Sequence, residues 1–256
     1  MTDSPACNLV PGKCWLGVVF TLGVAATPFS QAEEVVYRET FPNPTGQAQS
    51  LVEYAWTYHL GPAGWDETRN DATQSLVNES RGSQPDAAPV ASGDDATSPN
   101  GYVVNALGPD GLDDDPWWNR LSLYVTEEVA IDQSTHALTA MSVDLAVSQP
   151  DAARFVVRVG DRWLASAEAF EPTPLAGYAV YDRFAADHAE CRLDFHVAEW
   201  LPLAFVPGTT MSLDLDTTPI TLPDGPLTAV GLLIQPTGFE AFDNFTIYGV
   251  SNTPSP

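Results

Sequence analysis

The chain is poor in basic residues, and this shortage excludes several classes of partner. Its 256 residues include 34 acidic residues but only 10 basic ones, which gives a formal net charge of −24. Lys13 is the only lysine, and every other basic residue is arginine. Nucleic acids and anionic membranes both bind through cationic contacts, so neither is expected as a partner. An acidic coat of this kind suits a salty, halophilic extracellular setting, or divalent cations, or both.

Cysteine is also scarce. Of the three cysteines, Cys7 and Cys14 lie in a segment that we expect to be removed, and only Cys191 remains. The mature chain therefore has no internal disulfide, and its stability must come from its core or from a bound metal. Cys191 shares strand parity with Leu193 and Phe195, which predicts a buried small hydrophobe.

Long apolar runs are missing except near the N-terminus. Residues 14–26 form an apolar stretch after Lys13, and the small residues of Ser30-Gln31-Ala32 follow it. The stretch is short for a membrane span and precedes a cleavage-like site, which predicts a signal peptide over residues 1–32. An uncleaved anchor is the alternative. The expected location is secreted or cell surface, with no membrane span after cleavage.

The rest of the chain is expected to form one domain over residues 33–250, followed by a flexible tail, 251–256. Residues 66–100 interrupt the strand-like pattern because they are rich in Asp, Ser, Gly, Pro and Ala. A segment of this length is either functional or disordered. We interpret it as a long acidic and polar insertion loop at the surface, with a binding lid as the alternative.

Helical periodicity is absent, and 22 prolines punctuate the chain. Apolar and polar residues instead alternate with a period of two, which is typical of half-buried strands. This alternation occurs in residues 121–126, 143–147, 192–197 and 211–216. Residues 155–159 and 162–165 flank Gly160-Asp161 and predict a hairpin, whereas the apolar run 227–235 predicts a central strand. The pattern indicates an all-β fold, an antiparallel β-sandwich of jelly-roll type.

Two carboxylates near opposite ends of the domain interrupt this pattern. Glu39 shares parity with Tyr37 and Phe41, and Asp243 shares parity with Phe245 and Ile247. If these apolar residues face the core, both acids do so too, and each needs a partner. First and last strands often lie side by side in jelly rolls. One structural Ca²⁺, which takes about six to eight oxygen ligands, would satisfy both acids. The alternative places each acid in water at a strand end or beside an arginine.

Glu39-Thr40-Phe41 and Phe242-Asp243-Asn244-Phe245 together resemble the first and last strands of carbohydrate-binding-module-like jelly-roll domains. Exported bacterial proteins of the exosortase-sorted (PEP-CTERM cargo) type carry similar domains, although the sorting tail of that cargo is absent here. The resemblance covers the layout of residues 35–250. It implies carbohydrate binding and a structural calcium ion between the first and last strands.

Trp117 and Trp118 are the candidate carbohydrate-binding residues. They are adjacent, so on a strand they face opposite ways, and at most one of them packs into the core. An exposed indole beside acids and amides suits a sugar, whose C–H face stacks while its hydroxyls form hydrogen bonds. Large aromatic residues also pack in cores and interfaces, which is the competing interpretation.

These features predict a secreted, non-catalytic β-sandwich protein that binds an extracellular polysaccharide or a cell-surface glycan. No Gly-x-Ser-x-Gly motif, glycine-rich phosphate loop or zinc-type histidine spacing occurs in the sequence. No catalytic residue is therefore assigned. A β-jelly-roll polysaccharide hydrolase or lyase remains the first alternative, because paired carboxylates would serve that chemistry. A structural surface or matrix protein is the second alternative.

Overall fold

The structure is a computed structural model that describes residues 32–42, 49–61, 79–82, 101–105, 121–147, 152–172, 174–175, 184–207, 209–235 and 240–252. All of these residues belong to one compact unit, Gln31–Pro256. Among them, no helix has the length and hydrophobicity needed to cross a membrane.

The described residues are almost entirely β-strand. The strands are β1 (Glu34–Glu39), β2 (Gln49–Ser50), β3 (Trp56–Gly61), β4 (Glu79–Gly82), β5 (Gly101–Asn105), β6 (Leu121–Thr126), β7 (Ile131–Asp132), β8 (His136–Val147), β9 (Ala152–Val159), β10 (Arg162–Ser166), β11 (Ala189–Asp194), β12 (Trp200–Val206), β13 (Thr210–Leu213), β14 (Pro226–Gln235) and β15 (Glu240–Ser251). A single 3₁₀ turn, η1 (Leu51–Tyr54), and one short helix, α2 (Phe184–Asp187), complete the described elements.

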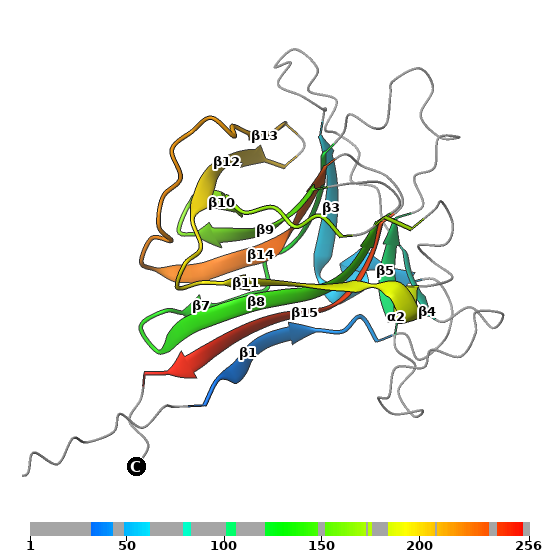
Figure 1. Cartoon of the computed structure of the whole chain (residues 1–256), viewed down its shortest axis with the longest axis horizontal. Coiled ribbons are helices and arrows are strands. Elements are labelled where there is room, and N and C mark those ends of the chain that lie inside the picture. Colours follow the sequence, from blue (N-terminus) through cyan, green and yellow to red (C-terminus); the bar gives the residue numbers. More distant parts are fainter. Residues whose placement is uncertain are drawn as a thin grey trace, which may run out of the picture. The chain divides into compact units, whose positions relative to one another are not determined.

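The strands form two antiparallel sheets. The seven-stranded sheet has the order β11-β8-β15-β5-β4-β2, and β1 pairs with β15. The eight-stranded sheet has the order β13-β12-β10-β9-β14-β6-β3, and β7 pairs with β14. In Figure 1 strands β9, β10, β12, β13 and β14 of the eight-stranded sheet lie above β11, β8, β15 and β1. The predicted all-β, antiparallel β-sandwich is confirmed, and its first and last strands are neighbours, as in a jelly roll.

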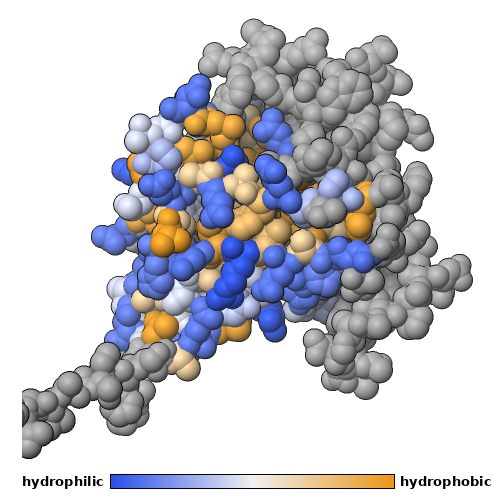
Figure 2. All heavy atoms as spheres, in the orientation of Figure 1, coloured by the Kyte–Doolittle hydropathy of each residue, from blue (hydrophilic) through white to orange (hydrophobic). Residues whose placement is uncertain are grey.

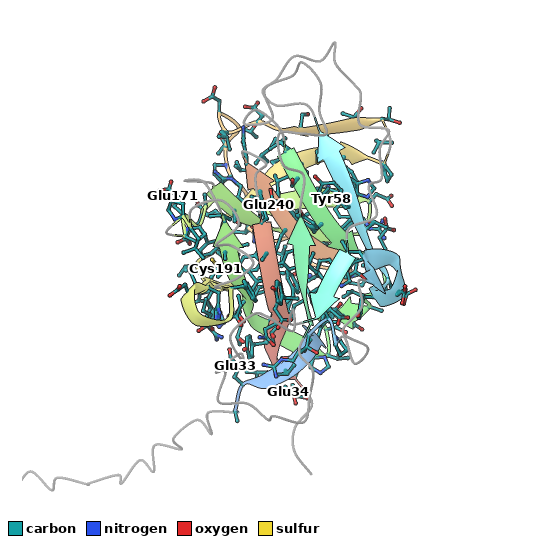
Figure 3. All side chains as sticks on the ribbon, turned by 90° about the vertical axis from the view of Figure 1, so that its right-hand side faces the viewer. Glu33, Glu34, Tyr58, Glu171, Cys191 and Glu240 are labelled. Atoms are coloured by element: carbon teal, nitrogen blue, oxygen red, sulfur yellow. The ribbon has the colours of Figure 1, made fainter. Side chains whose placement is uncertain are left out.

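The main core lies between the two sheets and is centred on aromatic rings. The ring of Trp56 lies 5.3 Å from that of Phe245 and packs edge to face against it. Phe155, from the opposite sheet to Phe245, lies 5.9 Å from it. Inside this core Glu240, labelled in Figure 3, is 1% exposed and accepts a 2.5 Å hydrogen bond from the Tyr124 hydroxyl. Aromatic pairs of this geometry stabilise the core beyond the apolar area that they bury.

The eight-stranded sheet also curls, so that its far ends approach each other. His59 of β3 and Phe205 of β12 are separated by four strands in the sheet order, yet their rings lie 4.8 Å apart. The curl encloses a second apolar cluster on the outer face of this sheet, which includes Leu123, Val156 and Leu203. This enclosure explains why β6 is buried on both faces, although its alternating sequence predicts one face in water.

Several local predictions are confirmed. The hairpin of β9 and β10 turns at Gly160, whose φ of 58° suits glycine. Strand β14 is central, pairs with β9 and β6, and is buried on both faces. Cys191 is buried (Figure 3). Of the predicted insertion 66–100 the structure describes only β4, a strand of the seven-stranded sheet, and the remainder lies outside the described residues.

Gly231 gives a test of the sheet packing. A Cβ atom there would lie 1.9 Å from the backbone oxygen of Tyr124, which cannot move without disrupting the β14–β6 ladder. We expect Gly231→Ala to lower the free energy of unfolding by more than about 3 kcal/mol, because backbone clashes exceed ordinary overpacking. Gly160→Ala is the control, since nothing lies within 4 Å of its Cβ position. Its positive φ costs only about 1 kcal/mol. Urea unfolding measures both, and equal losses would contradict this packing.

Candidate functional site

The structure brings the two predicted metal ligands onto adjacent strands. β1 and β15 pair antiparallel, with Glu39 opposite Phe245. Asp243 lies two residues before Phe245 on the same strand. The negative charge of Glu39 acts on Asp243 and helps to raise the pKa of Asp243. The predicted proximity of the first and last strands therefore holds, and it places Glu39 and Asp243 in one acidic neighbourhood.

A β-bulge changes the orientation that strand parity predicts for Asp243. The register of β15 against β8 shifts between Asp243 and Thr246, and Asn244 has a φ of 53°, a conformation that asparagine tolerates. Phe242 and Phe245 both belong to the main core. Asp243 lies opposite Asp144 on the outer face of the seven-stranded sheet, because cross-strand partners point the same way. The expectation that Asp243 faces the inter-sheet core is wrong for this reason.

Asp243 is nevertheless deeply buried. Its side chain is 6% exposed, and its Oδ1 atom has no hydrogen-bond partner within the described part of the chain. Burial raises the pKa of Asp243 to about 8, and the nearby carboxylates of Asp144 and Glu39 add to the rise. The Asn244 backbone N–H and the Arg38 charge oppose it only in part. A carboxyl group in this position either keeps its proton near neutral pH or binds a cation.

Glu39 is half-buried and already has two donors. Its Oε1 accepts hydrogen bonds from the backbone N–H groups of Thr40 at 3.0 Å and Phe41 at 2.8 Å. Burial still raises the pKa of Glu39 above its ordinary value. Burial, together with the Glu39 charge, also raises the pKa of Tyr37 to about 12. These shifts indicate that the neighbourhood disfavours further negative charge.

The outer side of this neighbourhood is formed by Asp144, Asn244 and His188. The Asn244 side-chain amide donates a 2.8 Å hydrogen bond to Asp144 Oδ2. His188 Nε2 lies 3.6 Å from Asp144 Oδ1. Asp144 Oδ2 therefore has a hydrogen-bond donor, whereas Oδ1 of Asp243, directly opposite, has none within the described residues. Asp243 Oδ1 is thus the oxygen of this cluster that is buried without a hydrogen-bond donor.

The donor set fits a hard cation in part. Carboxylate oxygens are the ligands that Ca²⁺ prefers, and the unpartnered Oδ1 of Asp243 is such a ligand. Within the ranges that the structure describes, however, no group of three or more His, Cys, Asp or Glu side chains is arranged around a metal position. Glu39 lies opposite the core residue Phe245, so it points to the other face of the sheet from Asp243. The two predicted ligands would therefore reach one cation only around the end of β1, with backbone carbonyls or water completing the coordination.

The tryptophans divide between the core and the undescribed segments. Trp117 and Trp118, the predicted carbohydrate-binding pair, lie outside the described residues. Trp56 and Trp200 are 0% exposed and Trp163 is 9% exposed, so all three are core residues. The competing interpretation of large aromatic residues as core therefore holds for these three.

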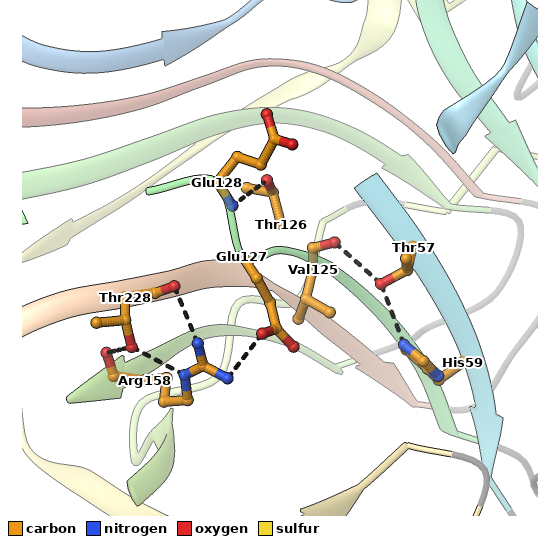
Figure 4. A network of polar contacts seen from close by, with 8 residues as sticks. All are labelled: Thr57, His59, Val125, Thr126, Glu127, Glu128, Arg158 and Thr228. Carbon is orange, nitrogen blue, oxygen red and sulfur yellow. Dashed lines mark hydrogen bonds and ion pairs between the residues drawn. The ribbon is translucent and has the colours of Figure 1, made fainter. Parts of the chain in front are cut away.

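A polar network crosses the outer face of the eight-stranded sheet (Figure 4). We call it the outer-face network, and it consists of Thr57, His59, Glu127, Arg158 and Thr228. Arg158 donates from Nε to Thr228 Oγ1 and from Nη1 to Glu127 Oε2, both at 2.8 Å. His59 Nε2 lies 3.1 Å from Thr57 Oγ1. The contacts form two groups with no hydrogen bond drawn between them in Figure 4. Arg158 of β9 joins β14 to Glu127, the residue that follows β6, and Thr57 of β3 also donates to the Val125 carbonyl of β6 at 3.3 Å.

Aromatic rings flank this network. The Arg158 guanidinium lies over the ring of Trp163, 5.1 Å from its centroid. The ring of Phe205 packs between Trp163, at 5.0 Å, and His59, at 4.8 Å. Burial lowers the pKa of His59, so its imidazole is neutral at neutral pH. Sequence reasoning missed these residues, and the only local signal was an arginine inside the otherwise apolar strand 155–159.

A surface pocket of about 380 Å³ is lined by residues next to this network in the sequence. Its walls are residues 159–162 at the β9–β10 turn and residues 223–226 before β14. Volumes of this size accommodate small ligands. Arg162 and Asp161 supply charged groups there, and Gly160 and Gly225 expose backbone.

Compared with known proteins, the chain matches no family model and no curated protein.

Asp243→Asn tests the burial of this carboxyl group. The native pKa is raised from 3.8 to about 8, so the folded protein holds a proton that the unfolded chain releases, and stability falls as pH rises from about 4 to about 8. The neutral amide removes this loss. In chelator, we expect the variant to gain stability relative to the wild type across this window. The gain is limited to about 5 kcal/mol, since each pH unit corresponds to about 1.4 kcal/mol.

Urea unfolding at several pH values measures the effect. Asp161→Asn, an exposed turn residue, is the matched control and should show no such pH-dependent gain. A variant that is less stable than the wild type at pH 8 would mean that the Asp243 carboxylate is ionised and well partnered.

Proposed function

We propose that the chain is a secreted, non-catalytic glycan-binding protein that resembles carbohydrate-binding-module-like jelly rolls. In this proposal a neutral extracellular polysaccharide or surface glycan binds on the outer face of the eight-stranded sheet. A structural Ca²⁺ is held on the other sheet by Glu39 and Asp243. The single observation that supports the glycan site best is the accessible end of the outer-face network, where the Glu127 side chain is 51% exposed beside the Arg158 guanidinium.

The chemistry of this network suits a neutral sugar. Glu127 Oε2 and the Thr228 hydroxyl each face the Arg158 guanidinium, which neutralises the local charge. Glu127 keeps a second carboxylate oxygen, and its side chain is 51% exposed. Arg158 has five N–H donors in a planar fork, and its three bonds to Glu127 and Thr228 leave others for a ligand. Sugar hydroxyls need such alternating donors and acceptors.

The adjacent pocket and the charge of the chain support the same ligand class. The pocket beside the β9–β10 turn offers Val159, two prolines, charged side chains and glycine backbone, and Val159 follows Arg158 in the sequence. A net charge of −24 repels polyanions, so an uncharged glycan meets the smallest electrostatic barrier. Trp117 and Trp118 stay candidates for stacking contacts with the same glycan.

Among the described residues, the raised pKa of Asp243 beside Asp144 is the feature that most resembles the acid and base of a hydrolase. A general acid must, however, reach the substrate, to within hydrogen-bonding distance. Asp243 is 6% exposed and its Oδ1 is fully covered. This burial favours a structural role for the carboxyl group over a catalytic one.

The glycan site is tested by Arg158→Gln. The variant removes the guanidinium that orders Glu127 and Thr228, so we expect at least a tenfold loss of affinity for the glycan that the wild type binds. A glycan array of neutral and cationic glycans identifies that ligand, and isothermal titration calorimetry measures the affinity. Arg192→Gln is the matched control, because it removes the same charge from the other sheet and should leave affinity within about twofold.

Thr57→Val provides a second variant in case Arg158→Gln unfolds. It keeps the side-chain shape and deletes the hydroxyl beside His59, and it should weaken binding several-fold. Unchanged binding by a folded Arg158→Gln protein would overturn the site. If the wild type binds nothing on the array, the glycan-binding function fails and the structural-protein alternative takes its place.

The calcium site is tested by thermal unfolding at pH 8 with and without chelator. A cation beside Asp243 stabilises the charged carboxylate, so Ca²⁺ should raise Tm by several degrees in the wild type. The Asp243→Asn protein should lose most of this response, while Asp161→Asn keeps it. No shift in the wild type, together with no bound metal in elemental analysis, would rule out the ion.

A further inference from the structure

The residue before β1 is anchored on the outer face of the seven-stranded sheet. Both carboxylate oxygens of Glu33 lie 3.0 Å from Nη2 of Arg192 on β11. The Thr139 hydroxyl on β8 donates a 2.5 Å hydrogen bond to Glu33 Oε1. The Arg192 guanidinium is itself fixed over the ring of Tyr248, 4.5 Å from its centroid. Glu33 thus contacts strands that β1 does not pair with, and it holds the start of β1 against the sheet.

β1 depends on this anchor more than an inner strand would. Within the described elements it pairs only with β15, and Glu34 opposite Gly249 is its first ladder position. Figure 3 labels Glu33 and Glu34 at the start of this strand. A further contact joins Glu34 to His136 Nε2 at 3.5 Å. The side chains of Tyr37 and Val36 on β1 close the main core at this edge.

The expected signal-peptide cleavage falls directly before the anchor. Hydrolysis of the Ala32–Glu33 peptide bond by a signal peptidase adds water, leaves a carboxylate on Ala32 and frees the amine of Glu33. The only lysine, Lys13, leaves with the removed segment. The cleaved chain then has a single primary amine, and this amine belongs to the residue that Arg192 and Thr139 hold.

We infer that Glu33 is the N-terminal residue of the mature protein and that its α-ammonium forms part of the anchor of β1. This inference rests on the proposed export, but not on glycan binding. The ammonium would lie among carboxylates: its own side chain, that of the next residue Glu34, and that of Asp194, whose negative charge acts on Glu33. It therefore offsets repulsion that the uncleaved chain retains.

The Glu33 carboxylate already behaves as a well-solvated, partnered group. The Thr139 hydroxyl and Arg192 hold its pKa below the usual value. The side chains of Arg192 and Glu33 are 42% and 39% exposed, so the ion pair is accessible and individually weak. Because this ion pair stabilises the fold only weakly, the charge of the α-ammonium would add a comparable amount. Neutralising the ammonium should therefore change Tm measurably.

The test uses the protein that a host exports from the full-length chain. Intact-mass analysis should give a chain that begins at Glu33. An amine-specific acetylating reagent should then add one acetyl group, located by peptide mapping on Glu33. Neutralising this amine should lower Tm by about 1 to 3 °C at low salt, the size expected for an exposed charge in a domain of this length.

Glu33→Ala is the matched variant, because an N-terminal glutamine would cyclise to pyroglutamate and lose its amine. The alanine removes the charged side chain and keeps the free amine, so it should lower Tm similarly, and acetylation should then add less than it does in the wild type. An exported chain that begins elsewhere, or one that takes up more than one acetyl group, would overturn the assignment of the terminus. An unchanged Tm after complete acetylation would overturn the role of the ammonium. Glycan binding, measured separately on the same sample, keeps these outcomes distinct from a failure of the proposed function.

Discussion

The pairing of β15 with β1 and β8, interrupted by the bulge at Asp243–Thr246, is the constraint on which the rest of the structure depends. The bulge lets Phe242 and Phe245 both face the main core, where Phe245 packs against Trp56 and Phe155. The same shift turns Asp243 to the opposite face, beside Asp144. A well-packed aromatic core and a poorly partnered buried carboxyl group are thus consequences of one local irregularity.

Much of the fold follows from the sequence because burial on one face imposes a period of two. The β9–β10 hairpin, the central strand β14 and the adjacency of the first and last strands were all predictable on this basis. The full burial of β6 was not, because it depends on the curl of a sheet whose remote ends meet at His59 and Phe205. Local alternation carries no information about such long-range curvature.

The candidate sites were less predictable. Glu39 and Asp243 were identified because a carboxylate among apolar strand residues is unusual, but the orientation of Asp243 could not be derived, since parity fails at a bulge. Asn244 was the available signal, as asparagine tolerates a positive φ. The outer-face network combines residues far apart in the chain, and no local pattern links Thr57 with Arg158.

Because the chain has few basic residues and many acidic ones, its acidic side chains outnumber the arginines that can pair with them. Arg158 contacts the outer-face network through three nitrogens of its planar fork, which lysine lacks. Arg192 holds the anchor of β1 through Nη2 while its guanidinium lies over Tyr248. Exposed acids such as Asp214 and Asp216 form a solvating coat, and hydrophilic side chains cover much of the described face in Figure 2. Glu240 and Asp243 are buried exceptions to this coat, and the proposed cation site depends on Asp243.

The most direct measurement is a carbon-detected NMR titration of the Asp243 carboxyl group in chelator, assigned with the Asp243→Asn variant. The buried, unpartnered carboxyl group predicts an apparent pKa of about 8, which falls when Ca²⁺ is added. An apparent pKa near the ordinary value of about 4, unaffected by Ca²⁺, would contradict both the burial and the cation site.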